Sequence, residues 1–233
     1  MINSLGNKIF LFLSLDKFSI VALNSTDDFV YKKESRINKK NDYIDKDFLD
    51  IFLSENIFKI EKELNEFIKN IFLIIDNQSI FSIHLSIKNK FDNIDINSNS
   101  IHKLLLEAKN CSKKTLEDLD ILHMKIDQFN IDGKFFKTLP KEKNCKNFSI
   151  EISYICLPKK ISKDIEHVLK KYQISLDKIL SFNYLRSFLE NKNDNLYKIA
   201  QKILDGFNEN EVHITKKNSK KLGFFEKFFN YFN

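Results

Sequence analysis

The chain has 233 residues, of which 42% are hydrophobic and 30% are charged, a balance typical of a folded globular protein and not of a disordered one. Its formal net charge is +6, which is too small to identify an acidic partner by itself. Only four glycines occur, and the sequence contains none of the common phosphate-loop, nucleophile-elbow or zinc-protease motifs.

The cysteines are three in number and far apart in the chain: Cys111, Cys145 and Cys156. They form no CxxC pair and no disulfide framework, so we expect reduced thiols in a cytoplasmic protein. The apolar stretch at residues 9–15 is short and precedes no cleavage site. No apolar run reaches the roughly 18 residues that a spanning helix needs.

The first third of the chain predicts strands followed by one long helix. Residues 8–23 form two predicted strands around a tight turn near Asp16, and residues 28–35 form a third, more polar one. A charged loop follows. Across residues 47–71 apolar side chains recur mostly at steps of three and four, which indicates an amphipathic helix. These apolar residues are Phe52, Ile57, Ile60, Leu64, Phe67 and Ile71.

Residues 79–89 alternate between polar and apolar side chains, the pattern of a strand with one buried face. Ser82, His84 and Ser86 fall on the polar face. The remaining predicted elements are a helix at 100–110, a strand within 118–136 that turns at Asp132–Gly133, a strand at 147–158, a helix at 162–174, a strand running into a helix at 176–190, and a helix at 193–207.

Side chains capable of catalysis are scattered. His84 and His123 each lie in a predicted strand beside apolar neighbours, where a structural role is favoured over metal binding. Asp118 and Asp120 resemble a carboxylate pair, but near a helix end they favour a solvated or capping role. The sequence therefore indicates no catalytic residue, no cofactor and no metal.

Nucleic acid is the other partner that a basic chain suggests. Only the run at residues 216–221 is densely basic, because acidic residues interleave with lysines elsewhere. No aromatic platform of the RNA-binding kind is present. We therefore expect no nucleic-acid binding.

The middle of the chain resembles the bacterial actin-like cell-division protein FtsA. The resemblance is carried by "DLDILHMKIDQFNIDGKFF" at residues 118–136 and the strand–helix–strand succession at residues 147–180. It covers roughly residues 8–189. The positions that match in order and spacing are Leu122, His123, Phe129, Ile131 and Asp132.

The resemblance implies an α+β fold, in which a partial actin-like lobe carries an inserted strand-helix-strand-strand module. The expected divisions are a lobe remnant at 1–50, the module at 51–175, further lobe elements at 176–207, a linker at 208–219 and a C-terminal amphipathic helix at 220–233.

Two departures from the family change the expected activity. Lys17 and Phe18 stand where the family has a phosphate-loop glycine, and bulky side chains there occupy the space that a phosphate needs. The second actin lobe, which in the family carries half the nucleotide cleft and the FtsZ-binding surface, is absent. The chain is thus expected to bind no ATP, and its binding to FtsZ is in question.

The C-terminal segment is expected to bind an anionic membrane surface. At 100° per residue, its apolar side chains fall on one half of the helical wheel and its polar ones on the other. Neighbouring lysines would favour an anionic leaflet. The predicted membrane-binding residues are Lys216, Lys217, Lys220, Lys221, Leu222, Phe224, Phe225, Phe228, Phe229, Tyr231 and Phe232.

Two functions follow as hypotheses. The first is a non-enzymatic, membrane-associated cell-division adaptor at the cytoplasmic face of the inner membrane, at the division site. It would bind division proteins or further copies of itself through strand edges at residues 80–87 or 148–156. The alternative is a soluble interaction module of pilus or secretion assembly, whose tail helix docks in a partner groove.

Overall fold

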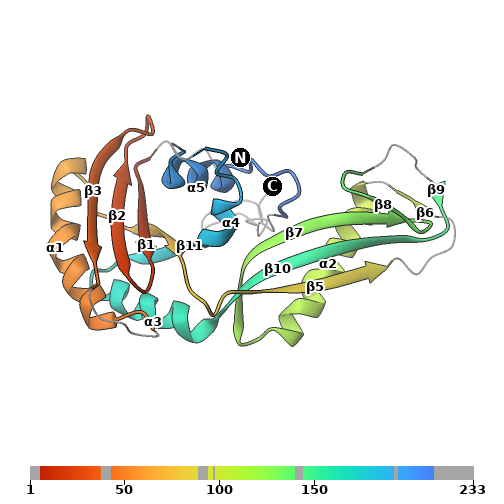
Figure 1. Ribbon diagram of the computed structural model, residues 1–233, viewed down its shortest axis with the longest axis horizontal. Helices are drawn as coiled ribbons and strands as arrows, with labels where there is room; N and C mark the ends of the chain where they lie inside the picture. Colours follow the sequence, from red (N-terminus) through yellow and green to blue (C-terminus); the bar gives the residue numbers. More distant parts are fainter. Residues whose placement is uncertain are drawn as a thin grey trace, which may run out of the picture.

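The computed structural model describes residues 6–37, 43–88, 94–96, 98–139, 144–191 and 194–212. Two larger β-sheets lie one after the other along the long axis of the molecule, each with its own helices (Figure 1). This mixture confirms the expected α+β class. Within the described ranges, none of the helices combines the length and apolar content needed to cross a bilayer.

The first sheet has five strands, and helices pack on both of its faces. In spatial order the strands are β11 (Ser175–Ser181), β4 (Asn70–Ile75), β1 (Lys8–Leu13), β2 (Lys17–Leu23) and β3 (Phe29–Arg36). β1 and β2 form the antiparallel hairpin that was expected around Asp16. β4 lies parallel to β1, and β11 lies parallel to β4.

Burial on both faces explains why the central strands are continuous apolar runs. The last five residues of β1 are all buried. α1 and α3 contribute to the core on one face of the sheet, while α4 and α5 contribute to the core on the other (Figure 1). The helices are α1 (Lys46–Leu64), α3 (Lys159–Lys170), α4 (Phe182–Arg186) and α5 (Leu196–Leu204).

α1 is shorter than its apolar pattern predicted. Asn65 caps its C-terminus in a left-handed conformation with φ 53°, and the Asn65 backbone N–H bonds to the carbonyl of Glu61. Beyond this cap Phe67 is 81% exposed, and Ile71 lies in β4. The prediction of a helix through residue 71 is wrong because a left-handed cap ends the helix, and apolar spacing does not reveal such a cap.

The second sheet has four antiparallel strands: β5 (Phe81–Lys88), β10 (Phe148–Pro158), β7 (Leu119–Ile131) and β8 (Lys134–Phe136). The turn between β7 and β8 confirms the predicted reversal at Asp132–Gly133. Both residues have positive φ, 48° and 83°, as a two-residue hairpin turn requires. A separate short pair joins β6 (Ile94–Asp95) to β9 (Asn144–Cys145).

Among the residues that the structure describes, one face of the second sheet carries the large apolar core of this unit. α2 (Ser98–Thr115) packs on this face through Leu104 and Ala108. The predicted alternation in β10 is confirmed, because its apolar residues join this core while Glu151 and Ser153 lie between them in the strand. The core residues of β10 are Phe148, Ile150, Ile152, Tyr154 and Cys156.

The pairing of strands suggests unit boundaries that differ from those expected. β4 belongs to the first sheet by its bonds to β1, and α1 and α3 belong to the first sheet by their packing. The expected module at 51–175 would have included β4, α3 and most of α1. We propose instead that the inserted module spans residues 77–158 and that residues 6–76 and 159–207 form the lobe.

Candidate functional site

The turn between β1 and β2 occupies the position at which the resemblance implies a phosphate loop. The Ser14 hydroxyl lies 2.6 Å from Asp16 Oδ1, and the Lys17 amide donates back to the Ser14 hydroxyl over 3.1 Å. Phe18 is completely buried and contacts the rings of Phe48 and Phe52. The Ser14 hydroxyl, the Asp16 carboxylate and the Lys17 amide thus bond to one another, and Phe18 packs in the core.

Asp16 and Asp76 follow the ends of the neighbouring strands β1 and β4. Burial raises the pKa of Asp76, and the negative charge of Asp16 adds to this rise, while Arg186 opposes it. Across the part of the chain that the structure describes, no group of three or more His, Cys, Asp or Glu side chains is placed to hold a metal ion.

A serine, a histidine and an aspartate meet on the polar face of the second sheet. The Ser153 hydroxyl lies 2.9 Å from His84 Nδ1 and also donates to Asp127. In a hydrolytic triad the imidazole stands between the hydroxyl and the carboxylate. Here the hydroxyl stands between the other two groups, so the order needed to activate a serine is lost.

The surroundings of Asp127 favour its charged form. Burial alone would raise the pKa of Asp127, but bonds from Lys125 and Ser153 outweigh it and lower that pKa. Lys125 Nζ lies 2.9 Å from Asp127 Oδ1. His84 is 73% exposed and Asp127 28%, whereas Ser153 is buried, so the imidazole is the group of this cluster that is most open to solvent.

The sheet edges are better candidates for a binding surface than the turn or the Ser153 cluster, because an unprotected edge presents unpaired N–H and C=O groups. The edge strand β3 exposes the charged side chains Lys32, Lys33, Glu34 and Arg36, which discourage pairing. β11, at the other edge of that sheet, lies against β7. β8 is only three residues long.

β5 differs from these edges. It has eight residues and pairs with β10 on one side only (Figure 1). Lys88, at its end, is its only Lys, Arg, Asp or Glu. Among the described residues, no backbone hydrogen bond reaches its outer side. Of the two strand edges expected to bind a partner, the one at 80–87 corresponds to β5, which does lie at the edge of its sheet. The other candidate, at 148–156, is wrong, because β10 lies between β5 and β7 and both of its sides are paired.

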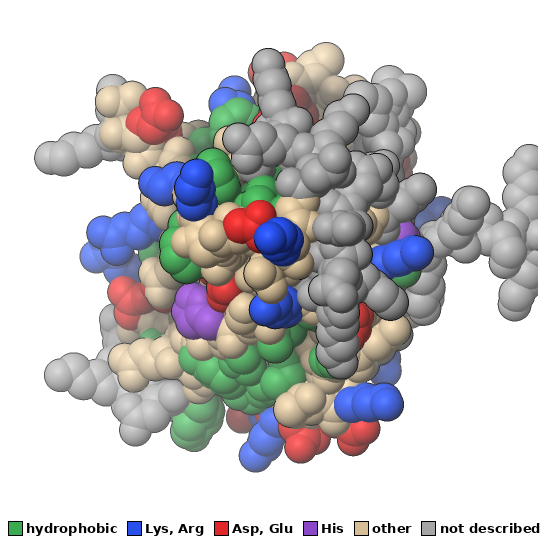
Figure 2. Space-filling model, turned by 90° about the vertical axis from the view of Figure 1, so that its right-hand side faces the viewer, with side chains coloured by type: hydrophobic (Ala, Val, Ile, Leu, Met, Phe, Trp, Pro, Cys, Tyr) green, Lys and Arg blue, Asp and Glu red, His purple; other side chains and the backbone are tan. Residues whose placement is uncertain are grey.

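Large hydrophobic side chains are exposed on the same unit. Figure 2 views the molecule from the end occupied by the second sheet and shows hydrophobic side chains gathered in the lower half of that face. Phe81, the first residue of β5, is 44% exposed. The other exposed large hydrophobics of this unit are Leu106, Ile121, Phe135 and Leu139.

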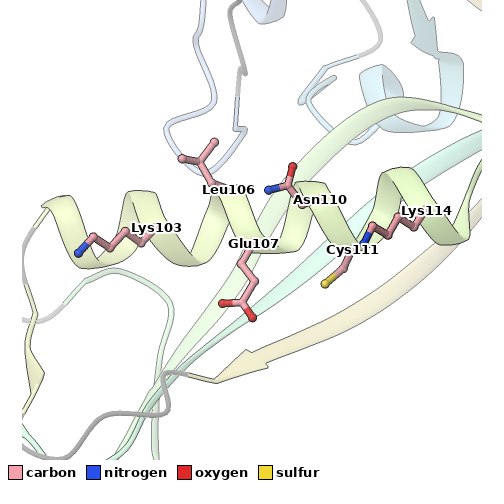
Figure 3. Close-up of a pocket in the computed structure, with 6 residues that line it drawn as sticks. All are labelled: Lys103, Leu106, Glu107, Asn110, Cys111 and Lys114. Atoms are coloured by element: carbon pink, nitrogen blue, oxygen red, sulfur yellow. The ribbon is translucent and has the colours of Figure 1, made fainter.

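A groove runs along α2 but has a poor shape for a small ligand. All of its described lining residues come from this one helix. Figure 3 shows Leu106 and Asn110 pointing away from the side on which Glu107 and Cys111 lie, so the side chains do not converge on one point. The full lining is Lys103, Leu106, Glu107, Asn110, Cys111 and Lys114.

A buried polar cluster joins the two sheets. Glu211, in the segment after α5, inserts a carboxylate that is 2% exposed. Its Oε1 lies 2.9 Å from Nδ1 of His123, in β7, and its Oε2 accepts a 2.8 Å bond from the Tyr184 hydroxyl, in α4. Lys178 of β11 approaches to 3.8 Å. We call Glu211, His123, Tyr184 and Lys178 the junction cluster.

The hydrogen bonds define the state of His123. The backbone N–H of Ser181 donates to Nε2 over 3.1 Å, so in the neutral ring the proton lies on Nδ1 and faces Glu211. Burial would raise the pKa of Glu211, but the bonds from His123 and Tyr184 and nearby positive charge lower it. His123 is thus a structural histidine, as expected, although sequence spacing gave no sign of its carboxylate partner.

The segment that carries Glu211 was expected to be part of a linker at 208–219. In the structure it docks on β7: the Ile126 amide donates to Asn210 and the Val212 amide donates to Met124, each over 2.8 Å. Residues 208–212 are therefore held, and the linker prediction is wrong for them. The predicted membrane-binding residues, from Lys216 to Phe232, lie outside the described residues.

No protein-family profile matches the chain, and no curated protein is significantly similar to it. Among solved structures, a PilM–PilN type IV pilus biogenesis complex gives a TM-score of 0.42 with 5% identity over 76% of this chain and 48% of that chain. The cytoplasmic domain of EpsL, an inner membrane component of the Vibrio cholerae type II secretion system, gives 0.38 with 6% identity over 77% and 59%.

A third structure, a Bacteroides thetaiotaomicron protein with an actin-like ATPase fold and unknown function, gives a TM-score of 0.32 with 17% identity over 81% of this chain and 58% of that chain. The match thus spans about half to three fifths of each of these chains. The chain has a distant structural similarity to actin-like fold proteins, which identifies no specific family. None of these comparisons identifies FtsA as a relative of the chain.

Proposed function

We propose that this chain is a non-enzymatic interaction scaffold that binds a protein partner by adding a strand to β5. The carrying observation is that β5 is an eight-residue edge with a single charged residue at its end, whereas the comparable edge β3 is rich in charge. Natural sheets protect edges that must stay unpaired, so an unprotected edge is a recognised docking site.

The chemistry of β5 defines the partner. In an antiparallel ladder alternate residues of a strand direct their N–H and C=O groups to the same neighbour, so half of the residues of β5 direct theirs outward. A strand added there would continue the core face through Ile83, Leu85 and Ile87. On the other face it would meet Ser82 and His84. The partner segment is therefore extended, with alternating apolar and polar residues.

Two cellular roles are compatible with such a scaffold. A division adaptor is the role that the FtsA resemblance implies, and an assembly scaffold of a pilus or secretion system is the alternative. One of the distant structural neighbours is itself a complex of two proteins, but the proposal depends on β5. Membrane attachment through the C-terminal segment remains part of the proposal.

Site-specific photocrosslinking in the native host tests the proposed edge. A photoreactive residue at Ser82 or Ser86 of β5 should give a discrete adduct with a protein chain. The photoreactive residue substituted for the exposed Lys32 of β3 is the matched control and should give no adduct. Equal labelling from both edges, or none from β5, would refute strand addition at β5.

A further inference from the structure

The alternation of apolar and polar residues in β5 makes the strand complementary to a second copy of itself. Its sequence, FSIHLSIK, alternates strictly between apolar and polar residues. In an antiparallel pair, directly opposite residues point to the same face. A second β5, related to the first by a two-fold axis that passes beside one residue of the strand, thus places apolar residues opposite apolar ones and polar residues opposite polar ones. Building on the proposed function, we infer that the strand added at β5 is the β5 of a second copy of this chain.

Strand overlap and charge together select the register of this two-fold pair. An axis at Ile83 would pair only residues 81–85 of β5, whereas an axis at Leu85 pairs residues 82–88. With His84 on the axis, the two His84 rings would face each other. With Ser86 on the axis, His84 would face the partner's Lys88. Both arrangements oppose groups that are or can become cationic, which destabilises a cross-strand pair. With Leu85 on the axis, Lys88 faces Ser82 and His84 faces Ser86, so no like charges are opposed.

The same register brings an imidazole close to a carboxylate. The Ser86 hydroxyl donates a 2.7 Å bond to Glu151 Oε1 on the adjacent strand β10. His84 of one copy would lie beside Ser86 of the other, and therefore near that carboxylate. By symmetry this contact occurs twice, and the two sheets become one continuous sheet of eight strands.

Interface size predicts the strength of association. One strand pair alone is smaller than the roughly 1,200–2,000 Å² that a standard stable interface buries. The dimer should therefore form and dissociate with concentration and not persist as a permanent assembly.

Charge reversal in sedimentation velocity tests the pairing. Ser82→Lys places a lysine opposite the partner's Lys88 and should weaken self-association about tenfold. Adding Lys88→Glu to the same chain turns both repulsive contacts into ion pairs and should restore self-association at least to the wild-type level. Ser54→Lys, at an exposed position on α1, makes the same charge change and should have no effect.

Cysteine crosslinking tests the register. Cys111 is exposed, so the variants are made with Cys111→Ser. Leu85→Cys should form an interchain disulfide across the axis, whereas His84→Cys should not. Preferential crosslinking of His84→Cys, or failure of Lys88→Glu to rescue Ser82→Lys, would overturn the inferred pair.

The two proposals fail separately. A wild-type chain that stays monomeric at high concentration, while Ser82 still crosslinks to a different protein, overturns only the second-copy inference. A monomeric chain with no crosslink from β5 overturns the proposed function as well.

Discussion

His123 Nδ1 and Glu211 Oε1 lie 2.9 Å apart although 88 positions separate the two residues in the chain. Both side chains are almost fully buried, with 0% and 2% exposure. Lys178 lies in β11 of the first sheet, and Tyr184 lies in α4, which packs on that sheet. Because His123 lies in the second sheet, the cluster ties the C-terminal segment to both. The carboxylate adds a buried polar link to the apolar contacts that the second sheet makes with the core of the first through Leu122 and Leu157.

Removing that carboxylate should destabilise the protein. Glu211→Ala deprives His123 and Tyr184 of their acceptor, and leaving a buried donor unsatisfied costs about 1–3 kcal/mol. Urea unfolding measures the loss. Glu209→Ala, at an exposed position two residues earlier, should change the free energy of unfolding by less than about 0.5 kcal/mol. Equal losses for both variants would contradict the role of the junction cluster.

The junction cluster should also make the protein acid-sensitive. The pKa of Glu211 is held below its ordinary value of 4.5, so near that pH the unfolded chain binds more protons than the folded one. The contribution to stability is complete above pH 4.5 and is lost as the pH falls through the lower, folded-state pKa. Glu211→Gln removes the titrating group, so the stability gap between wild type and variant should shrink on acidification. A gap that stays constant down to acid unfolding would contradict this assignment.

The chain should bind no Mg-ATP. Ser14, Asp16 and Lys17 bond to one another within the turn, and the buried ring of Phe18 stands where the FtsA resemblance implies a phosphate-loop glycine. Titration calorimetry with Mg-ATP is expected to show only the heat of dilution. Micromolar binding would overturn this prediction and reopen the question of an enzymatic activity.

Ser153 should not act as a nucleophile. Its hydroxyl donates to Asp127 and contacts Nδ1 of His84. Asp127 lies 3.5 Å from that same nitrogen, so it does not orient the ring from the far side as a triad carboxylate does. We expect no labelling of the chain by a fluorophosphonate probe. Labelling of wild type that disappears in Ser153→Ala would show that the cluster is catalytic.

The C-terminal segment should bind anionic liposomes reversibly, and binding should weaken as salt rises. Its basic residues can add about 1 kcal/mol each near an anionic leaflet. Phe225→Glu with Phe229→Glu places charge on the predicted apolar face and should abolish sedimentation with the liposomes. Asn230→Glu with Asn233→Glu adds the same charge to the predicted polar face and should retain most binding. If the phenylalanine variant still sediments like wild type, this segment is not the anchor.

Local patterns in the sequence determined much of the secondary structure. The alternation in β10 predicted its buried face, because a strand has a period of two. The pair Asp132–Gly133 predicted the turn after β7, because both positions need positive φ. The end of α1 was missed, since the left-handed cap at Asn65 depends on local backbone geometry that apolar spacing does not encode.

The arrangement of the elements was decided only by tertiary structure. Periodicity indicates which face of a strand is buried but not which strand lies beside it. β5 and β10 therefore gave equal expectations of an open edge, although one is an edge and the other is central. Glu211 lies in a polar segment that predicted a linker. Only folding brings the buried His123 ring and the Tyr184 hydroxyl close enough to stabilise its charge in place of water.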